Sequence, residues 1–290
     1  MSFFAALFID GILAGSIYAL IALAFVVVYK AARIINFALG ECVMLGALLV
    51  AFGLHGLGLG LAGALAMAAA GMAALAALFS RLVLRRLFGA PLISLIMVTL
   101  GLGALIRGGG TIMLGGAPRE ITLPIDRAPI DAGMLQIGTD RLVAAIIAAL
   151  CVAAVAWFHH RSRTGVALRA IAEDRAAAMA AGIDVQRYVA LTWVAMGVIC
   201  VAAGTLWTFV SGGGFSVALV GLKVFPIVII GGLDSIPGTI VGAMLVGVLE
   251  SLAAGYLDPS FGAVAAWLVL VLVLLLRPHG LFGTPRVERV

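Results

Sequence analysis

Nine apolar segments make up most of this chain, and each is close to the roughly 20 residues that a helix needs to cross a bilayer. Hydrophobic residues account for 64% of the 290 positions and charged residues for only 11%, whereas soluble domains carry about 25% charged residues. Charges this sparse cannot cover a water-facing surface, so most of the surface must contact lipid. The sequence therefore predicts one all-α domain over residues 1–290, a polytopic transmembrane helical bundle of about eight to nine membrane segments. The expected segments are residues 11–29, 37–54, 61–83, 91–106, 142–158, 188–210, 217–232, 238–256 and 261–276.

Two of the apolar stretches are interrupted by polar residues and glycine. The first is FVVVYKAARIINFALGECVMLGALL at 25–49, and the second is VFPIVIIGGLDSIPGTIVGAMLVGVLES at 224–251. Interruptions at corresponding places in two halves of a membrane chain are typical of transport pathways built from discontinuous helices. We therefore expect two broken or re-entrant helices in pseudo-symmetric halves. The candidate substrate-pathway residues lie at the two interruptions and are Asn36, Phe37, Gly40, Glu41, Gly231, Gly232, Asp234 and Ser235.

The polar residues of the interruptions also have structural interpretations. Glu41 has a structural interpretation, in which it caps a helix start or pairs with Lys30 or Arg33, and a functional one, in which it lines a pathway. Both interpretations stay open, because an ionised group at membrane depth usually faces either protein or a water-filled cavity. Asp234 or Ser235 can cap the helix that follows. In the same half, Lys223 is expected to extend its ammonium group to a membrane interface, and Glu250 to lie near a membrane face.

The distribution of arginine predicts the orientation of the bundle. Arginines are concentrated at 81–90, at 159–187 and after residue 276, whereas the stretch 107–141 balances its arginines with acidic residues. Positive loops remain on the cytoplasmic side, so these three regions, including the C-terminus, are expected in the cytoplasm and 107–141 outside. The prolines in 107–141 disfavour a continuous helix, so we expect an extracytoplasmic linker that could also dock an outer partner.

The segment 159–187 differs from the other loops. Residues 165–181 are rich in Ala, Leu, Arg and Met, which favour helix, and Gly182 is expected to end that helix. One face of this helix carries Val166, Ala170, Glu173, Ala177 and Ala180, and the small residues among them would permit close protein contact. A docking helix for a cytosolic partner fits this composition, and a solvated charged loop is the alternative.

Four strings of residues, in order along nearly the whole chain, resemble a known family. They are INFALGE at 35–41, AEDRAAAMAAGI at 172–183, GGLDSIPGTIVGAMLVG at 231–247 and RPHGLFG at 277–283. In combination they resemble the permease subunits of branched-chain (hydrophobic) amino-acid ABC importers. The chain departs from that family at Leu39, where the family commonly has His in the string NFAHGE. A polar position at the centre is therefore apolar here, which bears on specificity.

The resemblance implies an assembly. It implies a homologous second permease or a second copy of this chain, two cytosolic ATPase subunits and a periplasmic substrate-binding protein, in a bacterial cytoplasmic (inner) membrane. It implies no cofactor in this chain, because ATP and Mg would be bound by the ATPases. The residues themselves predict no metal site, since no CxxC or Cys/His cluster is present, and no nucleic-acid partner, since the basic residues are nearly all arginines of short loops. The solutes implied are branched-chain or hydrophobic amino acids, or small polar solutes such as amides and urea. The residues that match the family's ATPase-coupling segment are Arg169, Ala172, Glu173, Asp174, Ala178, Gly182 and Ile183.

The expected mechanism is alternating access driven by partner ATPases, because the chain lacks the GxxxxGK[ST] loop that cradles ATP phosphates. An ion-coupled secondary transporter is the alternative, since such proteins also use broken helices, but it gives the Ala-rich cytoplasmic helix no role. An intramembrane enzyme would need a nucleophile–base pair or a metal cluster, and no His accompanies a Ser or Asp at membrane depth. We therefore expect a permease and not an enzyme.

Overall fold

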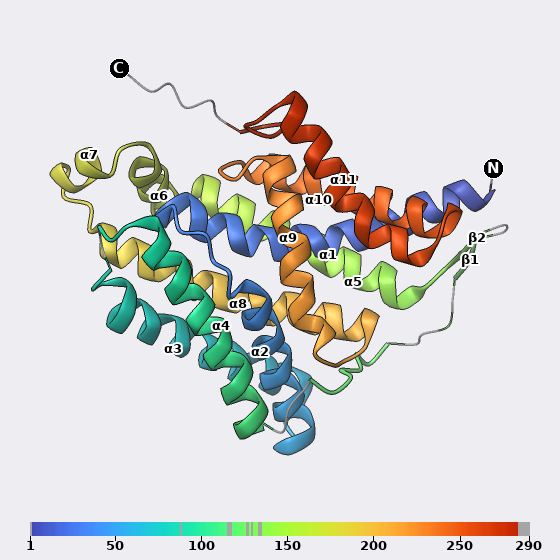
Figure 1. The fold of residues 1–290 in the computed structure, drawn as a ribbon. Helices are drawn as coiled ribbons and strands as arrows, with labels where there is room; N and C mark the ends of the chain where they lie inside the picture. The colour runs from blue at the N-terminus through green and yellow to red at the C-terminus, as the bar shows by residue number, and fades with distance from the viewer. Residues whose placement is uncertain are drawn as a thin grey trace.

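The computed structural model describes residues 2–87, 89–114, 118–125, 128, 130–132 and 135–283. Over these residues the chain forms a helical bundle with one small hairpin (Figure 1). The helices are α1 (Ser2–Ala32), α2 (Leu39–Ala51), α3 (Leu61–Phe79), α4 (Leu92–Leu114), α5 (Thr139–Arg161), α6 (Arg163–Glu173), α7 (Arg175–Ala180), α8 (Val185–Ser211), α9 (Ser216–Gly231), α10 (Ile236–Tyr256) and α11 (Pro259–Leu276). Single π-helical turns extend α2 over Phe52–Gly56 and α3 over Ser80–Leu84.

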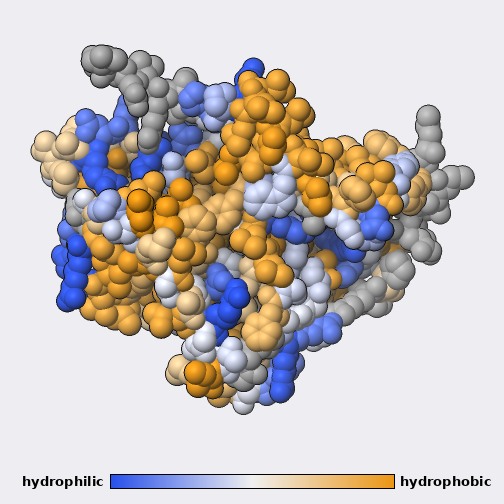
Figure 2. All heavy atoms as spheres, in the orientation of Figure 1, coloured by the Kyte–Doolittle hydropathy of each residue, from blue (hydrophilic) through white to orange (hydrophobic). Residues whose placement is uncertain are grey.

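The membrane prediction is confirmed at the level of segment number. Eight helical stretches in the described part of the chain are long and apolar enough to cross a membrane, and α9 is a shorter apolar helix. Side chains such as Leu105, Ile112 and Leu275 are more than 70% exposed in the single chain, as lipid-facing residues would be. Figure 2 shows a largely hydrophobic surface, with hydrophilic side chains gathered at several places, including the end that carries α6 and α7.

Helix α1 forms the centre of the bundle. Its middle, residues 19–28, is apolar on all sides, and residues 20–24 are fully buried among α5, α8, α9 and α10. Its closest approach is to α10, where a Cβ atom on Gly11 would come within 2.5 Å of the Cα of Val248. The GxxxG pair Gly11 and Gly15 therefore lets two helix backbones pack directly together, as small residues do in membranes.

The predicted linker at 107–141 is shorter than expected, because α4 continues to Leu114. A backbone at membrane depth must satisfy its own hydrogen bonds, so the three glycines at 108–110 do not end the helix there. The linker also contains a two-stranded antiparallel hairpin, β1 (Ile130–Ala132) and β2 (Leu135–Ile137), in which Ile130 pairs with Ile137. Of the predicted linker, Asp126, Arg127 and Pro129 lie outside the described residues.

The single helix expected over 165–181 is two helices. Asp174 leaves the helical conformation between α6 and α7, and its Oδ1 accepts hydrogen bonds from the N–H groups of Ala176 and Ala177 at 2.8 and 3.0 Å. The N–H groups at a helix start have no backbone partner and can bond to an aspartate side chain, whereas the N–H groups inside a continuous helix are already bonded to backbone carbonyls. Gly182 then ends α7 with a φ of +83°, which agrees with the predicted stop.

Candidate functional site

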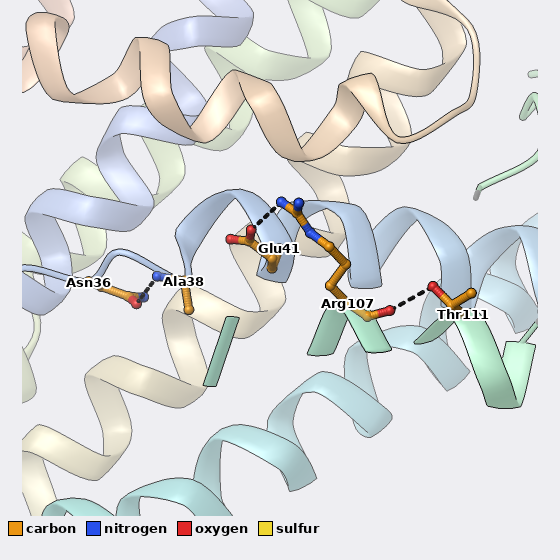
Figure 3. A network of polar contacts seen from close by, with 5 residues as sticks. All are labelled: Asn36, Ala38, Glu41, Arg107 and Thr111. Carbon is orange, nitrogen blue, oxygen red and sulfur yellow. Dashed lines mark hydrogen bonds and ion pairs between the residues drawn. The ribbon is translucent and has the colours of Figure 1, made fainter. Parts of the chain in front are cut away.

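The first predicted break is the irregular segment 33–38, through which the chain passes from α1 to α2. Asn36 is fully buried there, and its Oδ1 accepts the N–H of Ala38 at 3.0 Å (Figure 3). The N–H of Phe37 donates to Oγ1 of Thr99, on α4, at 3.3 Å. Among the described residues, Nδ2 of Asn36 has no hydrogen-bond partner. Helix α2 therefore begins inside the bundle, next to buried polar groups.

Glu41 lies in the first turn of α2 and forms an ion pair with Arg107 of α4 (Figure 3). Its Oε1 is 2.6 Å from Nη2 of Arg107, and the hydroxyl of Thr111 donates to the Arg107 carbonyl oxygen at 2.8 Å. Of the interpretations left open for Glu41, the pairing with Lys30 or Arg33 is therefore wrong. Arg107, assigned from the sequence to the outer linker, is part of α4 and reaches the carboxylate across the gap between α2 and α4.

The residues around this break pack against the middle of α9. A Cβ atom on Gly40 would collide with the carbonyl oxygen of Ala218, and one on Gly221 would lie 2.5 Å from the Cα of Gly40. One turn further along α9, the ring of Phe225 stacks on the ring of Phe37 with centroids 4.9 Å apart. The start of α2 is thus held against α9 by direct backbone contact.

The second predicted break is the turn between α9 and α10. Gly232 has a φ of +105°, a conformation that favours glycine, and Oγ of Ser235 accepts the N–H of Gly238 at 3.1 Å as the N-cap of α10. The capping role predicted for Asp234 or Ser235 is therefore confirmed for Ser235. The turn is covered by the segment 277–283, because Leu281 and Phe282 donate their N–H groups to the carbonyls at 230 and 231. The sequence strings GGLDSIPG and RPHGLFG, far apart in the chain, form one structural unit.

The first break begins at the cavity that the second break lines and continues deeper into the bundle. Asp234 lines a cavity of about 280 Å³ together with Tyr29, Arg33 and His279, at the end of the bundle next to α6. Gly221, which contacts the first break, is ten residues before Gly231 on α9, or about 15 Å along a helix. The structure therefore places Asn36, Phe37, Gly40 and Glu41 within the bundle, and Gly231, Gly232, Asp234 and Ser235 near its α6 end.

Two arginines join the predicted coupling segment to the end of α1. Nη2 of Arg33 donates to the carbonyl oxygen of Ala172 in α6 at 3.3 Å, and Nη2 of Arg175 in α7 donates to the carbonyl oxygen of Ala32 at 3.0 Å. Burial, and secondarily the positive charge of Arg33, lower the pKa of Arg175. We call these two reciprocal bonds the arginine clasp. Because Arg33 begins the first break, the clasp connects α6 and α7 directly to the segment that leads to Asn36.

The predicted coupling residues divide into two groups by exposure. Glu173, Asp174 and Gly182 are exposed. The others are partly or fully buried and hold the segment together. Arg169 donates to the His159 carbonyl at 2.7 Å, and the N–H of Ile183 donates to the carbonyl of the buried Ala178 at 3.0 Å.

A second polar cluster was missed from the sequence. The ammonium group of Lys223 on α9 forms an ion pair with Glu250 on α10 and lies 3.2 Å from the hydroxyl of Tyr18, which donates to Glu250 at 2.8 Å. The expectation that Lys223 extends to an interface is wrong, and Glu250 faces α1 and α9. The sequence separation of 27 residues between the two gave no sign of pairing, because only the turn between α9 and α10 brings them together.

No solved structure is significantly similar to this chain. The profile of the family described as "Branched-chain amino acid transport system / permease component" matches residues 7–277. The high-affinity branched-chain amino acid transport system permease protein LivH of Escherichia coli is 29% identical over 97% of this chain and 96% of its own length. The LivH protein of Salmonella typhimurium and the BraD protein of Pseudomonas aeruginosa are each 30% identical over the same shares. The chain is thus a multi-pass membrane protein that belongs to the family of branched-chain amino acid transport system permease components.

Proposed function

We propose that this chain is one transmembrane half of an ATP-driven importer that moves branched-chain or similarly hydrophobic amino acids into a bacterial cytoplasm. As a permease component it supplies the membrane pathway and not the ATP hydrolysis. Its partners are a second permease, homologous or identical, two cytosolic ATPases that bind ATP and Mg, and a periplasmic substrate-binding protein. The relatives named above are described as parts of branched-chain amino acid transport systems, which supports this class of solute.

The arginine clasp is the observation that carries the proposal. Helices α6 and α7 present an exposed face with Glu173, Ala177 and Ala180, which is free to contact a cytosolic protein. Their opposite side is bound through Arg33 and Arg175 to the end of α1. A partner that moves α6 and α7 would therefore pull on the first residue of the break between α1 and α2.

The same connection suggests how access alternates. Helix α2 starts inside the bundle, with Gly40 against α9 and Glu41 paired to α4. When ATP brings the two ATPases together, α6 and α7 move with them, and the segment 33–38 transmits that motion to α2 and α9. Asn36 lies on this route, and its buried Nδ2 has no hydrogen-bond partner among the described residues. The ATPases thus bias a two-state element that the permease itself supplies.

Reconstitution tests the proposal. Proteoliposomes that contain this chain, its partner permease, the ATPases and the binding protein should take up leucine only when ATP is present on the side of the membrane that carries the ATPases. Uptake by this chain alone, driven by an ion gradient without ATP, would instead establish the ion-coupled transporter. A second assay uses the double variant Gly182→Pro with Glu173→Lys, which should lose the ATPases during purification while the membrane domain stays folded. If the variant keeps its ATPases, the assignment of α6 and α7 is wrong.

A further inference from the structure

A cavity of about 260 Å³ lies between α1, α5, α6 and α8, at the end of the bundle that carries α6. Its lining includes the buried Val27 of α1, and Phe158 of α5 and Leu191 of α8, which are both exposed in the single chain. Exposed apolar side chains on helices of membrane length face hydrocarbon. The cavity is therefore accessible from the bilayer, between α5 and α8.

The side chains that line this cavity are apolar except for His159, Thr164 and Thr192. His159, near the end of α5, is only 6% exposed, and its Nε2 has no hydrogen-bond partner among the described residues. The hydroxyl of Thr192 already donates to the Val189 carbonyl oxygen of its own helix at 2.7 Å. A buried nitrogen that has lost its water without gaining a partner is unfavourable, and in native proteins such a group calls for an explanation. A ligand in the cavity would supply the missing partner.

Water alone does not match this cavity. A buried water needs about two to four polar partners and occupies only about 30 Å³, so it would leave most of the apolar wall without contacts. A cavity of about 150 Å³ lined by apolar side chains holds a benzene ring, and by that measure this cavity holds a chain of about ten carbon atoms. An alkyl chain would fill the apolar part, and a polar group at its end would meet the imidazole.

A hydroxyl is the polar group that suits the imidazole best. In a neutral imidazole Nε2 is either a donor or an acceptor, depending on the tautomer, and a hydroxyl can pair with it in both cases. A carboxylate can only accept, and moving its charge from water into a mainly apolar cavity costs far more than moving a hydroxyl. An alkyl chain without a polar group would leave Nε2 unpaired. The lining thus selects a neutral amphiphile with one chain and one hydroxyl.

The same cavity touches the point where α5 and α6 meet. A Cβ atom on Gly165 would lie 1.9 Å from the carbonyl oxygen of His159, and Nη1 of Arg169 donates to that oxygen at 2.7 Å. Thr164 and Leu168, both of α6, belong to the lining. A molecule in the cavity would therefore contact α6 and the residue of α5 on which α6 rests, and it would restrict the motion of one against the other.

We propose that this cavity is a binding site for a single-chain membrane alcohol, with an alkyl chain of about ten carbon atoms and a terminal hydroxyl. The hydroxyl bonds to Nε2 of His159, and the chain lies along Val27 and Leu168 toward the bilayer. The bound alcohol holds α6 against the end of α5. This inference goes beyond the proposed function and does not depend on it, because the site consists of residues of this chain alone.

The test is photolabelling of the full chain in lipid nanodiscs with 1-decanol that carries a diazirine in its chain. Peptide mass spectrometry should find saturable labelling within residues 155–168 and 191–195. Unlabelled 1-decanol should suppress it, whereas decane and decanoate should compete at least about tenfold less well, because decane forms no hydrogen bond and decanoate must bury a charge. Equal competition by either compound, or no saturable labelling at these residues, would overturn the proposal.

Two substitutions on α8 form a matched pair that tests the location. Residue 195 lines the cavity, so the added ring of Ala195→Phe should fill it and lower saturable labelling at least about tenfold. Val198, three residues further along α8, is exposed and lies outside the lining. Val198→Phe adds an aromatic ring to the same helix and should be labelled as the unmodified chain is. Undiminished labelling of Ala195→Phe would place the alcohol elsewhere.

The variant His159→Phe tests the hydrogen bond separately from the volume. Phenylalanine keeps an aromatic ring at this position and removes a nitrogen that has no partner, so the variant should fold. In this variant decane should compete as well as 1-decanol. If the preference for the alcohol persists, the assignment of its hydroxyl to His159 is wrong. Should Ala195→Phe not purify in folded form, this variant decides alone.

Hydrogen exchange of residues 163–173 tests the effect on α6. Saturating 1-decanol should slow the exchange of α6 in the unmodified chain and in Val198→Phe, and should leave it unchanged in Ala195→Phe. Equal slowing in all three proteins would mean that the alcohol acts through the bilayer and not through the cavity. Unchanged exchange in the unmodified chain would refute the restriction of α6.

Discussion

The guanidinium group of Arg175 donates a hydrogen bond to the carbonyl oxygen of Ala32, the last residue of α1, over 3.0 Å. The next residue, Arg33, returns a bond to α6 and has a φ of +55°, the one non-glycine positive φ recorded in the described part of the chain. A left-handed residue of this kind costs roughly 1–2 kcal/mol. Helix α1 thus ends where the chain is bound to α6 and α7, so these helices and the first break are directly connected.

Breaking the arginine clasp should uncouple transport from ATP hydrolysis. In the variant Arg33→Ala with Arg175→Ala, two hydrogen bonds from charged donors are lost, each worth about 1.5–3 kcal/mol. We expect the ATPases to remain bound, because the exposed face of α6 and α7 is unchanged, while leucine uptake per ATP hydrolysed falls about tenfold or more. Uptake and phosphate release in the same proteoliposomes give this ratio. Arg86→Ala, at an exposed position after α3, is the control and should leave the ratio unchanged. A normal ratio in the double variant would contradict the role of the clasp.

The end of α7 should depend on the glycine at position 182. Its φ of +83° costs an alanine roughly 1–2 kcal/mol, so Gly182→Ala should loosen the turn between α7 and α8. Gly182→Asn should have a smaller effect, since asparagine tolerates this conformation better. Hydrogen exchange of residues 175–184 measures the loosening, and coelution of the ATPases measures its consequence. Equal protection in the unmodified chain, Gly182→Ala and Gly182→Asn would show that a side chain at position 182 does not strain the turn.

The ion pair between Glu41 and Arg107 should stabilise the contact of α2 with α4. Removing one partner leaves the other charge at membrane depth without a counter-ion. Glu41→Gln and Arg107→Gln should therefore each lower the free energy of unfolding by about 1–3 kcal/mol. This loss is smaller than for a fully buried pair because the Arg107 side chain is half exposed. The double variant should lose less than the sum of the two, and the difference gives the coupling energy. Thermal unfolding in detergent provides all four values. Strict additivity would mean that the two groups do not interact.

The contact between Gly40 and Gly221 should not tolerate a methyl group. Alanine at either position would meet the backbone of the other helix, which cannot move aside as a flexible side chain can, so each change should cost about 1–3 kcal/mol. The matched control is Gly101→Ala on α4, where an added Cβ meets nothing within 4 Å and helix propensity improves. Thermal stability should therefore fall in Gly40→Ala and Gly221→Ala and stay equal or rise in Gly101→Ala. A similar loss in all three would rule out the close packing of α2 on α9.

Much of the fold follows from local sequence. Apolar segments of membrane length predicted the spans, since hydrocarbon accepts only helices whose backbone bonds are internal. The sequence predicts a helix start capped by Asp234 or Ser235, which the structure assigns to Ser235, and a helix stop at Gly182, because capping depends on a few adjacent residues. The helix break at Asp174 also has a local cause, yet it was missed: the favourable composition of 165–181 concealed one side chain that bonds two N–H groups.

The sequence alone determined that this protein lies in a membrane, which family it resembles and where several of its helices begin or end. The tertiary structure alone decided which charges meet. Arg107 finds Glu41 across 66 residues, Glu250 finds Lys223 around the α9–α10 turn, and the segment 277–283 covers a turn that lies more than 40 residues before it. The physical reason is that helix formation depends on neighbours within a few residues, whereas charge pairing depends on the packing of whole helices, which no local pattern records.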